Sequence, residues 1–330
     1  MPGPHELRAA ILAIVAEVKQ RVEESWRADE DRDVPLYHYT SQSGLLGILN
    51  SQVLFATDAR FLNDSEELRY VDGVLSGIGA ELAVRTAFGE SLKARLAAGE
   101  LRTRNHGGAF VASFSEQADL LSQWRAYADD GSGYVVGLPD HSHLFVAGDE
   151  EREPWPAPLL KVEYDPVKQR ALLGAPIGAL VALIEDYCSA GARSDEEQAG
   201  WLQEAIGSIA LIAAHLAPAI KHPGFAEERE WRAVVRFHES MYPGYPLHFR
   251  PSRYGLAPYI HLTSTFTDDG APRLELGEVV VGPKLDREIG VRSAMYLLRQ
   301  HGHWPEPEQP PGPLERGKPP RVRHSATSYR

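Results

Sequence analysis

The residues best suited to chemistry lie where a short strand pattern ends in His38, Tyr39 and Thr40. An imidazole can donate and accept hydrogen bonds, so with two neighbouring hydroxyl groups it could orient the hydroxyls of a ribose. Polar side chains at the end of a strand, where a loop begins, often bind ligands. The alternative is that His38 is a structural strand residue bonded to backbone. The segment Asn63–Glu67 has a structural alternative too, because Asp64 or Ser65 could cap a helix whose first turn holds two glutamates.

A second polar segment lies in the middle of the chain. Ser113 and Ser115 flank Phe114 at the end of an apolar run, and a glycine-containing turn follows at 131–133. Between them, Trp124 and Tyr127 are three residues apart and therefore share one face of a predicted helix. The serines and the turn are typical of a pocket rim. The aromatic pair could instead belong to the core.

A third segment pairs acidic residues with an apolar strand pattern. If residues 226–235 form a strand, Glu228, Glu230 and Arg232 point to one face and the apolar residues at 231, 233 and 235 to the other. A carboxylate held at a sheet edge could then face a substrate. The alternative is a solvated edge whose charges discourage aggregation.

The elements that position these residues follow from apolar periodicity. Strand and helix patterns do not alternate regularly, which favours an α+β fold over a doubly wound sheet. A helical stripe runs from Leu7 to Trp26. Strands are predicted at 36–39, 53–56, 109–113, 134–138, 159–164, 231–237, 259–262 and 278–281, and helices at 45–49, 66–88, 118–128, 166–216 with a break near 191–195, and 287–300.

The chain ends in a segment of different composition. Seven prolines lie between Pro305 and Pro320, and no acidic residue follows Glu315. The segment could be a linker with a solvated strand. It could also return to the body and lend an arginine to an anionic ligand or nucleic acid. We expect an N-terminal amphipathic helix at 1–34, one domain at 35–304 with a helical insertion at about 166–221, and a basic tail at 305–330 belonging to that domain.

Composition excludes several classes of protein. The net charge of −12 over 330 residues argues against binding nucleic acid or an anionic membrane through the whole surface, and no membrane partner is expected. The single cysteine, Cys188, fits a reducing, cytoplasmic setting and lies in an apolar helical pattern typical of a buried thiol. Nucleotide-binding glycine motifs and a Gly-x-Ser-x-Gly elbow are missing from the sequence. The close histidine pairs, at 141 and 143 and at 301 and 303, have no cysteine or regular acidic spacing beside them, so no metal is predicted.

The ordered set of these segments resembles a known family. His38-Tyr39-Thr40, Asn63–Glu67, Ser113-Phe114-Ser115, Gln123–Tyr127, Glu228–Arg232, Val281–Lys284, Ser325 and Tyr329-Arg330 together resemble domain-of-unknown-function family 2971 from about residue 35 to the end. That family in turn resembles the ADP-ribosyltransferase superfold, especially DNA-modifying bacterial toxins. The resemblance implies an α+β fold with a split mixed/antiparallel sheet core and a helical insertion.

The resemblance also implies roles for individual residues. Glu230 would stabilise the positive charge that develops on the ribose of NAD, with Glu228 positioning the acceptor and His38 binding the adenosine ribose. Trp124 or Tyr127 would stack on the nicotinamide, and Arg125 or Arg253 would pair with the pyrophosphate. The expected NAD-binding set is His38, Tyr39, Thr40, Asn63, Ser113, Ser115, Trp124, Tyr127 and Arg125.

The activity implied is transfer of ADP-ribose from NAD to a macromolecule, a nucleic-acid base being favoured over protein. A bacterial toxin or phage-defence effector with a neutralising antitoxin partner would fit this activity. Two alternatives stay open: a non-catalytic nucleotide- or ligand-sensing module of a stress or defence system, and an NAD glycohydrolase. The serine segment at 113–115 only approximates the superfold's second motif, and the helical insertion has no counterpart in the minimal fold.

Overall fold

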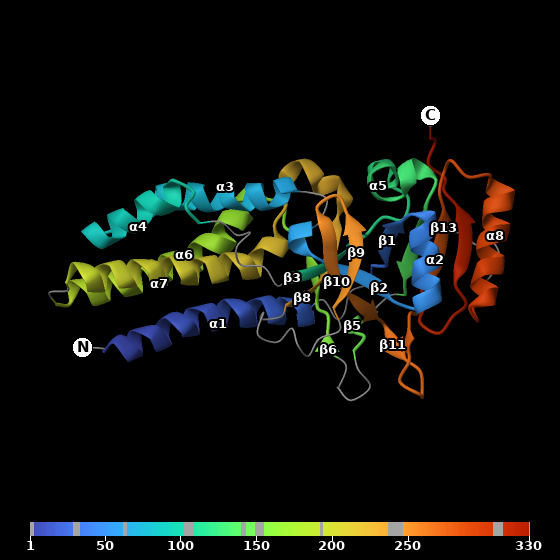
Figure 1. Cartoon of the computed structure of the whole chain (residues 1–330). Coiled ribbons are helices and arrows are strands. Elements are labelled where there is room, and N and C mark those ends of the chain that lie inside the picture. The colour runs from blue at the N-terminus through green and yellow to red at the C-terminus, as the bar shows by residue number, and fades with distance from the viewer. Residues whose placement is uncertain are drawn as a thin grey trace. The chain divides into compact units, whose positions relative to one another are not determined.

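A computed structural model (Figure 1) describes residues 3–28, 34–61, 65–101, 109–139, 143–148, 155–191, 194–236, 247–305 and 313–329. The chain forms two compact units. The helical unit comprises Met1–Arg27, Ala59–Gly108 and Val162–Phe225, and the sheet unit comprises Ala28–Asp58, Ala109–Lys161 and Ala226–Arg330. Each unit therefore collects segments that lie far apart in the sequence.

The helical unit gathers the long apolar helices of the sequence, and local caps set where they begin. Asp165 accepts a hydrogen bond from Val167 N at the start of one helix, and Ser194 and Glu197 form a capping box at the start of the next. The break predicted near 191–195 is thereby confirmed. The helices are α1 (Pro4–Ala28), α3 (Ser65–Glu81), α4 (Ala87–Ala97), α6 (Pro166–Ser189) and α7 (Asp195–Leu216).

The single helix predicted at 66–88 is wrong, because α3 ends at Glu81 and α4 begins at Ala87. Thr86 caps the second helix through Gly89 N. The buried carboxylate of Glu185, in α6, accepts hydrogen bonds from the Thr86 hydroxyl and from the amides of Arg85 and Thr86. These bonds fix the start of α4 on α6.

Helix α6, and α7 with the turn that follows it to Ala219, are long and apolar enough to cross a membrane by length and composition alone. This is weak evidence for a membrane, because core helices of soluble proteins share those properties. The two helices pack on each other within the unit, where the rings of Tyr187 and Trp201 meet edge to face at 5.2 Å.

The sheet unit is built around a mixed, largely antiparallel open sheet, which confirms the predicted α+β class. In the described residues it has twelve strands, and its main path runs β14-β13-β4-β1-β3-β2-β10-β5-β6. The strands are β1 (Leu36–Thr40), β2 (Leu54–Asp58), β3 (Ala109–Ser115), β4 (Tyr134–Leu138), β5 (Phe145–Val146), β6 (Trp155–Pro156), β7 (Leu159–Lys161), β8 (Glu230–Arg236), β9 (His248–Ser252), β10 (Gly255–Thr263), β13 (Glu278–Val281) and β14 (Arg321–His324). Strands β11 (Thr265–Phe266) and β12 (Pro272–Arg273) form a separate pair.

Apolar side chains cover both faces of this sheet. One face packs under α2 (Gln42–Ser51) and α8 (Arg287–Gln300), with Leu36, Val136 and Val279 in the core. The other face carries a smaller core beneath α5 (Leu121–Tyr127), which includes Tyr39 and Trp124. We call the first the α2 face and the second the α5 face.

Among the strands that the structure describes, β3 pairs with three others, β8 along one edge and β1 and β2 along the other. Along one edge it pairs with β8 over its full length. Along the other edge Ser115 pairs with Tyr37 of β1, whereas Val111 and Phe110 pair with Thr57 and Asp58 of β2. Strands β1 and β2 therefore separate from each other along one edge of β3. We call this separation the fork.

Candidate functional site

The imidazole of His38 lies at the fork. Its Nδ1 donates a hydrogen bond of 3.0 Å to the carbonyl oxygen of Ser113, which lies between the β1 and β2 pairings of β3. Burial lowers the pKa of His38, and the charge of Arg250 lowers it further, although the bond to Ser113 opposes both effects. The ring is therefore neutral at pH 7, with its proton on Nδ1.

Register relates the strand of His38 to the strand of Glu230. Tyr37 of β1 and Glu230 of β8 lie opposite the same residue, Ser115. Residues opposite each other in antiparallel pairs point to the same face, so Glu230 belongs to the α5 face and His38 to the α2 face. The sequence prediction that the side chains of His38 and Glu230 face each other across one site is therefore wrong. The ring of His38 can approach the α5 face only through the fork.

The carboxylate of Glu230 is held by its neighbour on the same face. Arg232 Nε and Nη2 donate to Glu230 Oε1 and Oε2 at 2.8 and 2.9 Å. The two residues are 5% and 4% exposed, so this is a buried, two-pronged ion pair. Strand β8 also places Glu230 and Arg232 beside Ser115 and Ser113 of β3. The predicted alternation of residues 230–235 is thus confirmed.

Glu228 does not share that face by strand alternation. It ends the 3₁₀ helix η6 (Pro223–Glu228), and Arg229 has a φ of +43°, so strand β8 begins only at Glu230. The hydroxyl of Ser115 donates to the Glu228 carbonyl at 2.7 Å and accepts from Gln117 N at 3.0 Å. Ser115 therefore fixes this turn, and the expected binding role of its hydroxyl has no support.

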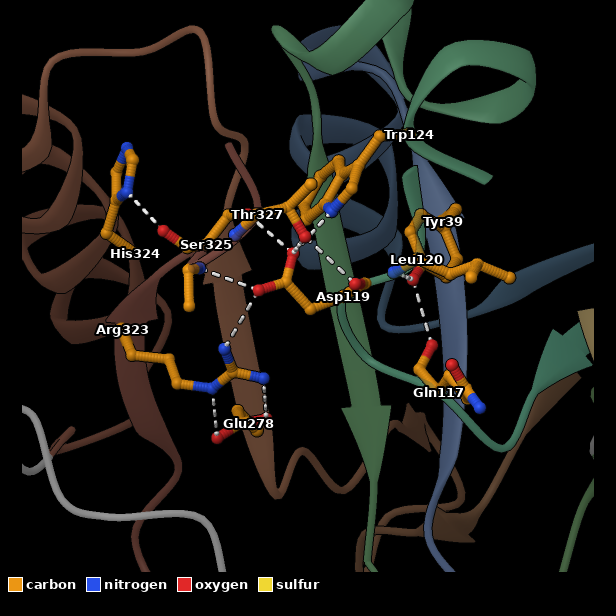
Figure 2. A network of polar contacts seen from close by, with 11 residues as sticks. Tyr39, Gln117, Asp119, Leu120, Trp124, Glu278, Arg323, His324, Ser325 and Thr327 are labelled. Atoms are coloured by element: carbon orange, nitrogen blue, oxygen red, sulfur yellow. Dashed lines mark hydrogen bonds and ion pairs between the residues drawn. The ribbon is translucent and has the colours of Figure 1, made fainter. Parts of the chain in front are cut away.

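Two aromatic residues predicted to bind NAD are structural instead. The hydroxyl of Tyr39 donates to the Gln117 carbonyl and accepts from Leu120 N, at 2.9 and 2.8 Å (Figure 2). Trp124 is fully buried, packs edge to face on Tyr39 at 5.2 Å and donates Nε1 to Asp119 Oδ1 at 2.7 Å. Core packing covers both rings, so Trp124 cannot stack on a nicotinamide.

Asp119, which the sequence did not single out, is the centre of the network in Figure 2. Besides Trp124, its carboxylate accepts from the hydroxyls of Ser325 and Thr327 and from Ala326 N. Burial alone would raise the pKa of Asp119, but these hydrogen bonds outweigh it and lower that pKa. The network fixes the C-terminal segment on the body of the sheet unit.

The arginines of the tail are paired with acidic residues of the sheet unit. β14 lies parallel to β13, with Arg323 opposite Val280. Arg323 binds Glu278 at 3.2 Å and lies 3.8 Å from Asp119, while Arg321 lies 3.8 Å from Glu278. The tail therefore returns to the body, as one of the two sequence hypotheses stated, but these two arginines hold the sheet edge.

The remaining predicted residues are dispersed. Thr40 is buried at the end of β1, and Tyr127 is 39% exposed on α5. Arg125 lies over the ring of Tyr329, and Arg253 over that of Tyr254. Asn63 lies outside the described residues.

A cluster of rings, also missed from the sequence, lies on the same sheet face as Glu230. Phe55 packs on Tyr259 at 4.4 Å, and His261 stacks on His248 at 3.8 Å. We call these four residues the ring cluster. Arg250 lies beside it and donates Nη2 to the Thr57 hydroxyl at 3.0 Å. The signal in the sequence was the segment 248–261, which is rich in aromatic and histidine residues.

The chain was compared with protein families, curated proteins and solved structures. No curated protein and no solved structure matches the chain. A model of the family described as "Protein of unknown function (DUF2971)" matches residues 123–233, a range that begins within α5, includes α6 and α7, and ends within β8. The resemblance of the sequence to that family is thereby confirmed over residues 123–233.

Proposed function

We propose that this protein is an ADP-ribosyltransferase that takes NAD as substrate and modifies a macromolecule. Glu230 is the proposed catalytic carboxylate. The observation that carries the proposal is the position of Glu230, whose carboxylate is held beside Arg232 on the α5 face, across β3 from strand β1. Strands in a sheet are about 4.8 Å apart, so the backbones of β8 and β1 lie about 10 Å apart.

The fork supports the proposal in a second way. The resemblance implies a split sheet, and β3 is the strand from which β1 and β2 separate. The neutral ring of His38 at this point keeps its Nε2 as an acceptor, because Nδ1 donates to Ser113. An acceptor there suits a ribose hydroxyl group.

The proposed reaction breaks the bond between the ribose C1′ and the nicotinamide nitrogen. The bonding electrons leave with nicotinamide, which becomes neutral, and positive charge develops on the ribose. A carboxylate at Glu230 stabilises that charge and then takes the proton of the attacking group as its bond to C1′ forms. Arg232 donates hydrogen bonds to both carboxylate oxygens of Glu230. When NAD binds, one of these hydrogen bonds would shift to a phosphate oxygen of NAD and free one carboxylate oxygen for the ribose.

The same ion pair favours a second candidate, a non-catalytic module that senses a nucleotide. Both oxygens of Glu230 accept from Arg232, and both residues are buried. If this ion pair stays intact when NAD binds, Glu230 stabilises the fold and takes no part in catalysis. NAD would then bind without cleavage.

The test is release of nicotinamide and transfer of label from NAD labelled in its adenylate, with and without nucleic acid or protein acceptors. Three forms are compared: wild type, Glu230→Gln, and the exchange Glu230→Arg with Arg232→Glu. The exchange keeps an ion pair on β8 but moves the carboxylate by two residues. Glu288→Gln, on the exposed side of α8, is the matched control.

We expect nicotinamide release from wild type and the control, and a loss of at least about 100-fold in both Glu230 variants, in line with removal of a group that stabilises transition-state charge. Thermal unfolding of the exchange variant near that of wild type would separate chemistry from folding. Release without label transfer identifies a glycohydrolase. NAD binding without release identifies a sensor, and full activity in the exchange variant rules out Glu230 as the catalytic group.

A further inference from the structure

The β9–β10 hairpin differs in charge from the rest of the chain. Its sequence from Leu247 to Thr267 contains Arg250, Arg253 and two histidines but no acidic residue, although the whole chain has a net charge of −12. Arg250 and Arg253 are both exposed. A locally basic surface on an acidic protein attracts anionic partners to that surface alone.

The same hairpin supplies most of the ring cluster. Tyr259 and His261 come from β10, His248 from β9 and Phe55 from β2, and all four are half-buried. His261 stacks on His248 and on Phe55, with planes 20° and 25° apart, and Phe55 lies tilted by 32° against Tyr259. Half-buried aromatic rings of this kind are suited to stacking with the flat rings of a ligand. Burial and the neighbouring His248 lower the pKa of His261 to about 4, so this ring is neutral at pH 7.

Alternation assigns the residues of the hairpin to two faces. His248 lies opposite Tyr259 and Arg250 opposite Ala257, so His248 and Arg250 are on the face of the ring cluster. Tyr259 in turn lies opposite Thr57, and Thr57 opposite Val111, whose register partner in β8 is Val234. That face is the one that carries Glu230. Phe249, which is 59% exposed, points to the opposite face.

We propose that the ring cluster, with Arg250 and with Arg253 and Tyr254 at the hairpin tip, binds single-stranded nucleic acid. Bases extend the stack of rings, while the two arginines bind backbone phosphates. Unpaired bases are required, because a base inside a duplex is already stacked on both faces. The inference rests on the proposed function in one respect: it names single-stranded nucleic acid as the macromolecule presented to Glu230.

The test uses the full chain without NAD and measures fluorescence anisotropy of a labelled 20-nucleotide single strand over a series of salt concentrations. Tyr254→Ala and Arg253→Gln change the exposed tip and leave the sheet intact. Phe55→Leu with Tyr259→Leu removes two rings of the stack. Phe249→Ala is the control on the opposite face, and Tyr296→Ala and Arg292→Gln are exposed controls on α8.

We expect wild type to bind the single strand and to bind a duplex of the same sequence at least about 10-fold more weakly. Each aromatic variant should weaken binding by roughly 5- to 150-fold, the range for loss of base stacking. Arg253→Gln should reduce the slope of log affinity against log salt by about 0.7. The three controls should bind as wild type does.

The proposal is overturned if wild type does not bind the single strand, if it binds the duplex equally well, or if Phe249→Ala weakens binding as much as Tyr254→Ala. The assay contains no NAD, so failure to release nicotinamide in the enzymatic test does not affect it. Strand binding with no NAD cleavage would support this inference and contradict the proposed reaction.

Discussion

Replacing Asp119 should release the C-terminal segment and lower the free energy of unfolding of the sheet unit. Its carboxylate accepts from Trp124 Nε1, the hydroxyls of Ser325 and Thr327, and Ala326 N. A hydrogen bond to a charged group contributes about 1.5–3 kcal/mol, but bonds that share one acceptor are not additive. We therefore expect a loss of about 3–5 kcal/mol for Asp119→Ala, since it also leaves the buried indole N–H of Trp124 without its acceptor.

The assay is urea-induced unfolding at pH 7, followed by tryptophan fluorescence and far-ultraviolet circular dichroism. Asp119→Asn keeps the volume of the side chain but turns an NH₂ group toward the donors, so it should lose about 2–4 kcal/mol. Trypsin should cleave after Arg321 and Arg323 faster in both variants. Asp268→Asn, on an exposed turn, should change the free energy of unfolding by less than about 0.5 kcal/mol.

The pH dependence gives a second check on Asp119. Its hydrogen bonds lower its pKa below the ordinary 3.8 in spite of burial. A carboxyl group with a lowered folded pKa contributes stability above its unfolded pKa and loses that contribution as the pH falls through the folded pKa. The difference between wild type and Asp119→Asn should therefore be constant above about pH 5 and shrink below about pH 4. A difference under about 0.5 kcal/mol at pH 7, with the tail still protected from trypsin, would refute the assigned role.

Three further predictions concern other parts of the sheet unit. Glu230→Gln should lower the free energy of unfolding in urea by about 3–5 kcal/mol, because Arg232 stays buried without its charge partner. The exchange Glu230→Arg with Arg232→Glu should restore most of that loss. Equal losses in the two variants would contradict a simple ion-pair effect. The pKa of His261 falls from 6.5 to about 4 on folding, so the free energy of unfolding should decrease as the pH falls from 6.5 to 4. His261→Phe should reduce that decrease. An unchanged pH profile of thermal unfolding in this variant would argue against burial of the neutral ring. Gly133→Ala should lower the free energy of unfolding in urea by at least about 2 kcal/mol, because the added Cβ would lie 2.3 Å from the Thr40 carbonyl oxygen. Gly47→Ala, where an added Cβ meets nothing within 4 Å, should be neutral or stabilising.

Most secondary structure could be predicted from the sequence, because apolar periodicity and caps act locally. The limits of β13 and α8 match their predicted ranges, and the break between α6 and α7 follows from the cap at Ser194. Strand β9 was missed, since Arg250 and Pro251 interrupt its apolar pattern and only pairing with β10 makes it a strand. Strand β14 was missed for a similar reason, because its arginines are neutralised by Glu278 and Asp119 from distant parts of the sequence.

The candidate site was less predictable. Alternation along β8 correctly put Glu230 and Arg232 on one face, a property of any strand. The backbone turn at Arg229 could not be foreseen, and it removes Glu228 from that strand. Nor could the sequence show that Trp124 donates to Asp119, because the helical period fixes which residues share a face but not which neighbour covers that face.

The sequence by itself determined the α+β class, the resemblance to family DUF2971 and the order in which the histidine, serine and glutamate strands occur. Only the tertiary structure decided which of these side chains share a face. A strand's own residues fix its alternation, but its partners fix its register, and a shift of one residue reverses every side chain. Here that register sends His38 to the α2 face and Glu230 to the α5 face, on either side of β3.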